Sequence, residues 1–187
     1  MRLLHAWASI LLAVSATAGA VHPAVEDEAK ALKGIEYTAY LSGGQIAPQK
    51  LTCTDEGGGL LDSPGASSEV WAFGIAHCQG RTVLMLKQAV GKMKDHITWR
   101  IVDTMLLPPF EADWDPTRPH ALRSASMEEC ELDSGRTDTF FMALVRWGKN
   151  ERIDWRNGVE QAWTFDIPRG RITSLSIKRI VCEWFEP

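Results

Sequence analysis

The feature that most constrains the fold is a pair of apolar segments separated by only three residues. The segments read VWAFGIAHC, which ends at Cys78, and TVLMLKQAV, which begins at Thr82. Gly80 tolerates the positive φ of a two-residue hairpin turn, so we expect a Gln79–Gly80 turn with Cys78 opposite Arg81. A hairpin of this length commits the chain to an antiparallel sheet.

The first strand of this hairpin has two faces of different character, because side chains alternate along a strand. Trp71, Phe73, Ile75 and His77 share one face, and Cys78 ends a face of small residues. His77 and Cys78 therefore point to opposite sides of the sheet. They cannot form the hydrogen bond of about 2.6–3.2 Å that joins a nucleophile to its base. We interpret Cys78 as half of a disulfide and His77 as the end of an apolar stripe.

The N-terminus has the pattern of a secretory signal peptide. Arg2 precedes a mostly apolar run, and an A-x-A cleavage pattern ends at Ala20. The run is shorter than the roughly 20 residues that a membrane-spanning helix needs. We therefore expect residues 1–20 to be a signal peptide, residues 21–34 an arm or short helix, and residues 35–187 one β-rich domain.

Four cysteines in an exported chain predict two disulfides. The spacing includes no C-x-x-C and no H-x-x-x-H, so it matches no zinc pattern, and we predict no metal and no cofactor. We favour Cys53 with Cys78 and Cys130 with Cys182, because the second bond would tie the last strand to the domain. The other two pairings stay open. The signal pattern and the cysteines together predict a periplasmic or secreted protein.

Further segments extend the β pattern. Ile35–Leu41, Ile97–Leu107 and Asp138–Gly148 read as strands, and the third is apolar on both faces, which predicts a central position in a sheet. VEQAWTFD and RITSLSI flank IPRG and predict a second hairpin. Asp55–Ser68 is rich in Gly and small polar residues, which predicts a surface loop. We expect a mainly β fold, with α+β as the alternative: a single antiparallel β-rich domain with a short N-terminal helix and two disulfides.

The charge balance excludes several classes of partner. The chain carries 24 acidic and 20 basic residues, and loss of Arg2 with the signal peptide would increase the acidic excess. A general nucleic-acid binder has a basic excess instead. No later segment is apolar for long enough to span a bilayer as a helix. We therefore expect the partner to be another protein, with no nucleic acid and no membrane span.

Catalytic patterns are weak throughout the chain. No G-x-S-x-G elbow is present. Acidic pairs such as Asp113 and Asp115 could run a glycosidase-like mechanism or bind calcium. A chain with 24 acidic residues contains such pairs by chance, however, and nothing in their surroundings singles one out. We therefore predict no catalytic residue.

Two groups of residues are candidates for a binding surface. The first lies in a proline-rich segment that cannot join a sheet as a regular strand. The second combines aromatic and basic side chains, which are frequent interface anchors and form cation–π pairs. The first group is Phe110, Glu111, Asp113, Trp114 and Asp115, and the second is Trp147, Arg152, Trp155 and Arg156.

These observations predict an exported, non-enzymatic binding protein of a bacterial envelope, of the inhibitor or immunity type that acts on a partner protein. The alternatives are a small secreted hydrolase that uses a carboxylate or a histidine, and a structural envelope protein. An inhibitor should present a protruding loop or an aromatic patch. An enzyme should present a cleft with converging polar groups and a strongly shifted pKa.

Overall fold

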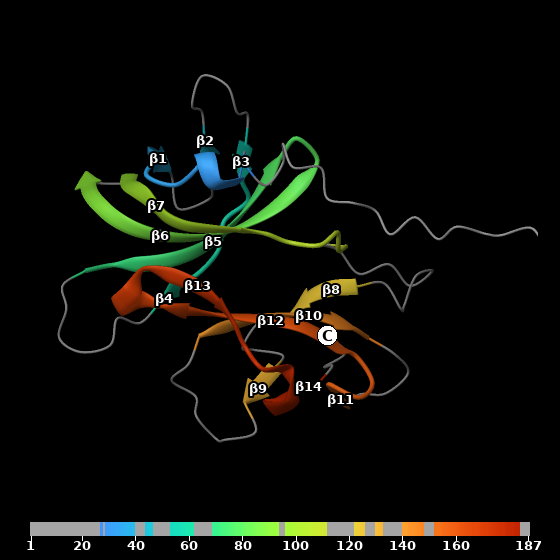
Figure 1. Ribbon diagram of the computed structural model, residues 1–187. Helices are drawn as coiled ribbons and strands as arrows, with labels where there is room; N and C mark the ends of the chain where they lie inside the picture. The colour runs from blue at the N-terminus through green and yellow to red at the C-terminus, as the bar shows by residue number, and fades with distance from the viewer. Residues whose placement is uncertain are drawn as a thin grey trace, which may run out of the picture.

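The computed structural model describes residues 27, 29–39, 44–46, 53–61, 69–93, 96–111, 122–125, 130–132, 140–147 and 152–183. In these residues the chain is mostly antiparallel β-structure, and its strands form three sheets that lie one above another (Figure 1). The prediction of an antiparallel β-rich fold with little helix is confirmed.

The first sheet is built from the N-terminal part of the described chain. Its seven strands pair in the order β1-β7-β6-β5-β3-β2, and β4 also pairs with β5. The hairpin register is confirmed, because Cys78 lies opposite Arg81 and the turn residues Gln79 and Gly80 both have positive φ, 49° and 77°. The strands are β1 (Glu36–Ala39), β2 (Gly44–Ile46), β3 (Cys53–Asp55), β4 (Leu60–Leu61), β5 (Trp71–Cys78), β6 (Arg81–Met93) and β7 (His96–Leu106).

The other two sheets follow in the C-terminal part. The second sheet has the order β13-β12-β10-β8 and the third has the order β11-β14-β9. The predicted second hairpin is β12 and β13, joined through the 3-10 helix η1 (Ile167–Arg169). The elements are β8 (Leu122–Ala125), β9 (Cys130–Leu132), β10 (Phe141–Arg146), β11 (Arg152–Asp154), β12 (Val159–Asp166), β13 (Arg171–Ser174), η2 (Ile177–Arg179) and β14 (Ile180–Glu183).

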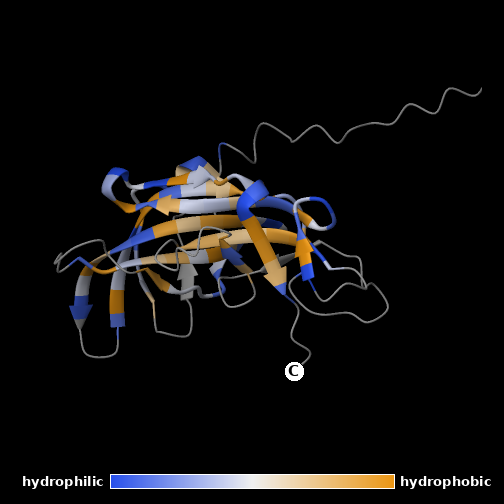
Figure 2. Cartoon of the chain, turned by 90° about the horizontal axis from the view of Figure 1, so that it is seen from below, coloured by the Kyte–Doolittle hydropathy of each residue, from blue (hydrophilic) through white to orange (hydrophobic). Residues whose placement is uncertain are grey.

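Two apolar clusters hold these layers together. Leu84 and Leu86 of the first sheet pack with Met142 and Leu144 of the second, and the opposite face of β10 packs against the third sheet. Strand β10 is therefore buried on both sides, as its sequence predicts. Apolar residues run along the middle of the strands, and hydrophilic residues gather at strand ends and turns (Figure 2).

The first sheet curls around its own inner face. Its edge strand β2 lies close to the opposite edge strand β1. The inner face carries the small residues of β5 together with larger side chains from β1, β6 and β7, and the short N-terminal helix packs there through Ala29 and Leu32. Small residues on β5 leave room inside the curl, and this room is where the candidate site lies.

Both disulfides join residues that lie directly opposite each other on neighbouring strands. Cys53 of β3 pairs with Cys78 of β5, and Cys130 of β9 pairs with Cys182 of β14. The favoured connectivity is therefore confirmed. The second bond ties the last strand, β14, to its neighbour β9 within the third sheet.

The expectation of a surface loop over Asp55–Ser68 holds only in part: Asp55 ends β3 and is buried, Leu60–Leu61 form β4, residues 56–59 between them are irregular, and residues 62–68 lie outside the described residues. The Phe73 N–H donates to the Gly59 carbonyl at 3.0 Å, and the Ile75 N–H donates to the Gly57 carbonyl at 3.0 Å. The glycines permit this close approach, since a Cβ at Gly58 would lie 2.1 Å from the Phe73 carbonyl oxygen. Glycine here serves backbone packing against β5, and the chain continues into β4.

Among the described residues, no helix has the length and apolarity needed to cross a membrane.

Candidate functional site

Two charged side chains are buried among the described residues, and they belong to one cluster. Asp55 at the end of β3 is 4% exposed, and Lys87 in the middle of β6 is 5% exposed. Charged side chains are rarely buried unless they are paired, because burial removes their hydration. This cluster is therefore the feature of the first sheet that packing alone does not explain.

Strand alternation places Lys87 on the inner face of the curled sheet. Val83 and Met85 precede it at every second position and pack in the inner cluster, while Leu84 and Leu86 face the second sheet. The register between β6 and β7 shifts directly at Leu86 and Lys87. Such a bulge re-aims side chains and is common beside functional sites.

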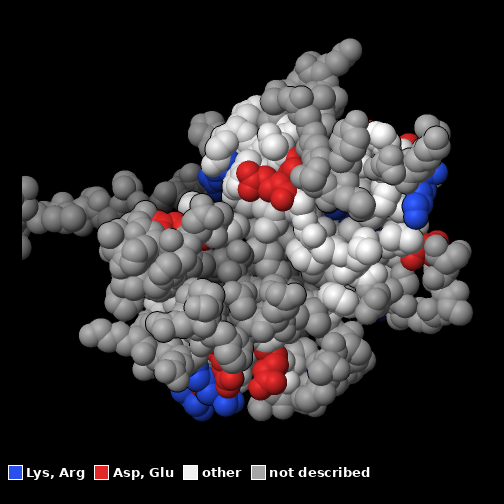
Figure 3. Space-filling view, turned by 180° about the vertical axis from the view of Figure 1, so that it is seen from behind, with Lys and Arg blue, Asp and Glu red and all other residues white. Residues whose placement is uncertain are grey.

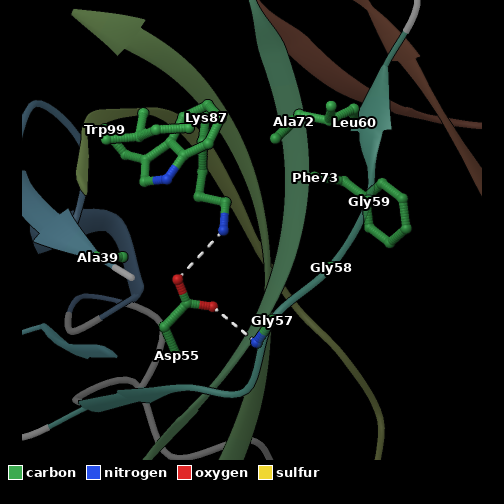
Figure 4. A pocket seen from close by; sticks show the side chains of 11 residues that line it. Ala39, Asp55, Gly57, Gly58, Gly59, Leu60, Ala72, Phe73, Lys87 and Trp99 are labelled. Atoms are coloured by element: carbon green, nitrogen blue, oxygen red, sulfur yellow. Dashed lines mark hydrogen bonds and ion pairs between the residues drawn. The ribbon is translucent and has the colours of Figure 1, made fainter. Parts of the chain in front are cut away.

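Asp55 lies on the inner face because side chains alternate along β3, and Cys53, two residues before it, also points inward. Its carboxylate accepts three hydrogen bonds. Tyr37 Oη donates to Oδ2 at 2.5 Å. Lys87 Nζ donates to Oδ2 at 3.1 Å, and the Gly57 N–H donates to Oδ1 at 3.0 Å (Figure 4). These three donors satisfy the hydrogen-bonding demand of the buried carboxylate.

A pocket of about 110 Å³ opens beside this cluster. Lys87 and Asp55 form its polar wall, and Lys87 Nζ lies 5.5 Å from the centroid of the Trp99 ring. The rest of the lining is backbone of Gly57, Gly58 and Gly59 and a set of apolar side chains (Figure 4). These apolar residues are Ala39, Leu60, Ala72, Phe73, Ile97 and Trp99.

Gly74 provides the space for the amine. A Cβ at Gly74 would lie 2.5 Å from Lys87 Nζ and 3.1 Å from the Gly57 carbonyl oxygen. An alanine there would displace the lysine or push on the backbone of the neighbouring segment. The glycine therefore stands at the position of β5 against which the Lys87 ammonium lies.

Burial shifts the pKa values of two members of the cluster. Desolvation lowers the pKa of the Lys87 amine, and the nearby Asp55 carboxylate opposes part of that shift. Desolvation also raises the pKa of the Tyr37 phenol, and its hydrogen bond to Asp55 raises it further. Tyr37 therefore remains a hydrogen-bond donor, while Lys87 is a lysine that loses its proton more easily than an exposed one.

The structure brings together three of the four residues in the predicted aromatic and basic group. Trp155 is 41% exposed in the turn after β11, with the Arg156 guanidinium 4.9 Å and the Lys178 ammonium 5.9 Å from its ring centroid. Arg152 is exposed on β11 and pairs with Glu183 at 3.2 Å. We call Arg152, Trp155, Arg156 and Lys178 the Trp155 patch.

The Trp155 patch rests on a tightly hydrogen-bonded turn. The Asp154 carboxylate accepts the Arg156 N–H at 2.7 Å, and Asn157 Oδ1 accepts the Asp154 N–H at 2.6 Å. Basic and acidic side chains lie side by side at the lower end of the molecule, where the third sheet is (Figure 3). Hydrogen bonds thus hold the backbone of this turn, and acidic neighbours accompany the cations of the patch.

The remaining predicted binding residues lie elsewhere. Trp147 is only 2% exposed and packs between the second and third sheets, so it is not part of the surface. Phe110 is partly buried against the cluster between the first and second sheets, and Glu111 is partly exposed beside it. Asp113, Trp114 and Asp115 lie outside the described residues.

His77 has a simple environment. Its Nδ1 lies 3.2 Å from Thr82 Oγ1, and its Nε2 lies 3.0 Å from a Glu56 carboxylate oxygen. Both side chains of the His77–Glu56 pair are more than a third exposed. Cys78 is in a disulfide on the other face of the sheet, so the two residues form no dyad.

Sequence reasoning did not select Tyr37, Asp55, Lys87 or Trp99. A signal was present, because Lys87 interrupts an apolar strand at a position that alternates with Val83 and Met85.

Among the described residues, no group of three His, Cys, Asp or Glu is arranged to hold a metal ion. No protein-family model, no curated protein and no solved structure matches this chain.

Proposed function

We propose that the protein is an exported binding protein that acts on a partner protein in the manner of an inhibitor or immunity protein. The observation that carries the proposal is the 41% exposed Trp155, which lies on a hydrogen-bonded turn and has two cationic groups 4.9 Å and 5.9 Å from its ring centroid. Trp and Arg are the residue types most enriched at binding hot spots. A periplasmic or secreted location fits, because disulfides persist in oxidising compartments.

The partner's chemistry follows from the charges of the patch. Arg152, Arg156 and Lys178 supply three cations, and two of them already have an acidic neighbour, Glu183 and Asp154. Lys178 and the Trp155 ring are thus the groups most available to a new acidic or aromatic contact. We propose a partner surface that offers a carboxylate beside an apolar side chain.

The test compares variants of the mature protein in capture from a periplasmic or culture-supernatant fraction. A discrete protein should be recovered by the wild type, and Trp155→Ala should weaken its binding about thirtyfold, as for a hot spot of about 2 kcal/mol. Val70→Ala, which truncates a side chain of similar exposure in another layer, should bind as the wild type does. The affinity of the recovered protein is then measured in purified form.

Two further substitutions test the charge. Arg156→Glu should weaken the complex, whereas Arg100→Glu, an exposed change on β7, should not. Trp114→Ala tests the proline-rich segment in the same assay. If no captured protein depends on Trp155 or on Trp114, the proposal is wrong.

A catalytic role is the second candidate function. The observation that favours it is the pocket in which Lys87, Asp55 and Tyr37 converge. Converging polar groups with shifted pKa values are what an enzyme would need.

A further inference from the structure

We infer that the pocket beside Lys87 takes a small aliphatic aldehyde, and that the Lys87 amine bonds to it reversibly as an imine. The inference is independent of the Trp155 patch. It depends on four features of the pocket: its size, its lining, the position of the amine, and the proton acceptor beside that amine.

The size limits the ligand. The pocket measures about 110 Å³. A cavity of roughly 150 Å³ holds benzene, so this pocket suits a molecule of about four heavy atoms. A three-carbon aldehyde has that size, whereas an aromatic aldehyde exceeds it.

The lining selects a neutral, partly apolar molecule. Ala39, Ala72, Ile97 and Trp99 line the pocket together with Lys87. A ligand with a carboxylate would bring a second negative charge close to Asp55 in a buried site, where like charges repel strongly. A carbonyl group avoids this repulsion and still presents an oxygen acceptor and an electrophilic carbon to Lys87.

The amine is placed for attack on that carbon. Lys87 lines the pocket, and its Nζ donates a hydrogen bond to Asp55 Oδ2 at 3.1 Å and lies 5.5 Å from the centroid of the Trp99 ring. Gly74 leaves the space around Nζ open, because a side chain there would overlap the amine. Lysines in apolar pockets are activated as nucleophiles by desolvation, which keeps a larger fraction of the amine neutral.

The chemistry balances with the groups present. The ammonium gives a proton to the Asp55 carboxylate, and the neutral amine forms a C–N bond while the carbonyl π bond breaks. The alkoxide oxygen and the nitrogen exchange one proton to give a carbinolamine. The second proton on nitrogen and the hydroxyl group then leave as water, and a C=N bond remains. No oxidant or reductant takes part, and water reverses the reaction.

The experiment is reductive trapping on the folded protein with its disulfides intact. The protein is treated with propanal and cyanoborohydride, which converts an imine to a stable propyl-lysine, and each lysine is quantified by peptide mass spectrometry. Exposed Lys33 and Lys178 are internal controls in the same molecule. Desolvation lowers the pKa of the Lys87 amine, so a larger fraction of it is neutral than of an exposed amine, and we expect Lys87 to be labelled severalfold faster than Lys178.

Two comparisons decide whether the pocket is responsible. Labelling with benzaldehyde should show no preference for Lys87, since benzaldehyde is too large for the pocket. Gly74→Ala should lower labelling of Lys87 by propanal and leave labelling of Lys178 unchanged. Labelling of Lys87 no faster than that of Lys178, or an equal preference with benzaldehyde, would overturn the inference, and neither result depends on partner binding.

Discussion

Replacement of Lys87 by methionine should destabilise the protein, and the neighbouring Asp55 should determine the size of the loss. Methionine keeps an unbranched, flexible side chain of similar shape and removes the charge. Asp55 then remains a buried anion, 4% exposed, with the Tyr37 hydroxyl and the Gly57 N–H as its remaining donors. A buried charge that has lost its counterion is among the costliest defects a core can carry.

The magnitude follows from the geometry. Two unit charges 3.1 Å apart attract by about 5 kcal/mol at an effective dielectric constant of about 20. Loss of hydration by both groups offsets much of this, and removal of one partner of a buried pair typically costs about 3–5 kcal/mol. Because Asp55 keeps two donors, we expect Lys87→Met to cost about 3 kcal/mol, near the lower end. That is a large part of a total stability of about 5–15 kcal/mol.

The sharper test is whether a second substitution, Asp55→Asn, raises or lowers the free energy of unfolding. Asp55→Asn in the wild type leaves the Lys87 ammonium without a counterion, so it should lower the free energy of unfolding. The same substitution in the Lys87→Met background removes an unpaired buried charge, so it should raise the free energy of unfolding. Only a direct interaction between the two side chains produces this reversal.

The assay is urea unfolding followed by tryptophan fluorescence, with the disulfides intact and equal slopes required of all variants. The thermal midpoint of Lys87→Met should fall by about 6–12 °C. Arg100→Met is the matched control, because it breaks an exposed ion pair with Glu36 at 2.6 Å and should cost less than about 1 kcal/mol. An effect of Asp55→Asn that is the same in both backgrounds would refute the reasoning.

Three further predictions concern the cysteines, Tyr37 and His77. The unreduced, denatured protein should contain no free thiol. Loss of the Cys130–Cys182 disulfide should lower the free energy of unfolding by about 4 kcal/mol and loss of Cys53–Cys78 by about 3.5 kcal/mol, since the two bonds close chain separations of 52 and 25 residues. An equal or reversed order of these two losses would contradict the loop-entropy argument. The Tyr37 phenol should stay protonated in the folded state above about pH 10, so its contribution to stability is present below that pH and is lost as the pH rises and the unfolded chain ionises. The chain has two tyrosines, so tyrosinate absorbance of folded wild type near pH 11 should equal that of Tyr37→Phe, and a clear excess in the wild type would disprove the buried hydrogen bond. His77→Gln should change the free energy of unfolding by less than about 1 kcal/mol, because its pair with Glu56 is exposed; a larger loss in urea unfolding would show that the pair is structural.

The parts of the fold that sequence predicts are those fixed by neighbouring residues. Gln79 and Gly80 set the hairpin turn, and the turn sets the pairing of every residue of β5 with the first eight residues of β6. The apolar run in β10 predicts burial on both faces because nothing polar interrupts it. In such cases the local pattern and the final environment carry the same information.

The candidate site depends instead on contacts between distant segments. Asp55 reaches Lys87 across a sequence separation of 32 residues, through a three-residue strand too short to show alternation. The register shift at Leu86 and Lys87 also has no marker in the sequence. A lysine at an inward position predicts that an acidic partner exists, but only the pairing of β3 with β5 identifies Asp55 as that partner.

The two proposed activities lie in different layers, and this separation is itself testable. Lys87 is in the first sheet, Trp155 follows β11 of the third sheet, and the second sheet lies between them (Figure 1). Substitutions at sites that share no contacts usually act additively. Trp155→Ala should therefore leave the trapping rate of Lys87 unchanged, and Lys87→Arg, which retains a cation near Asp55, should leave partner binding unchanged. If either variant alters the other property while the unfolding midpoint stays constant, the pocket and the patch are linked through the second sheet, and a ligand in the pocket would then regulate the binding surface.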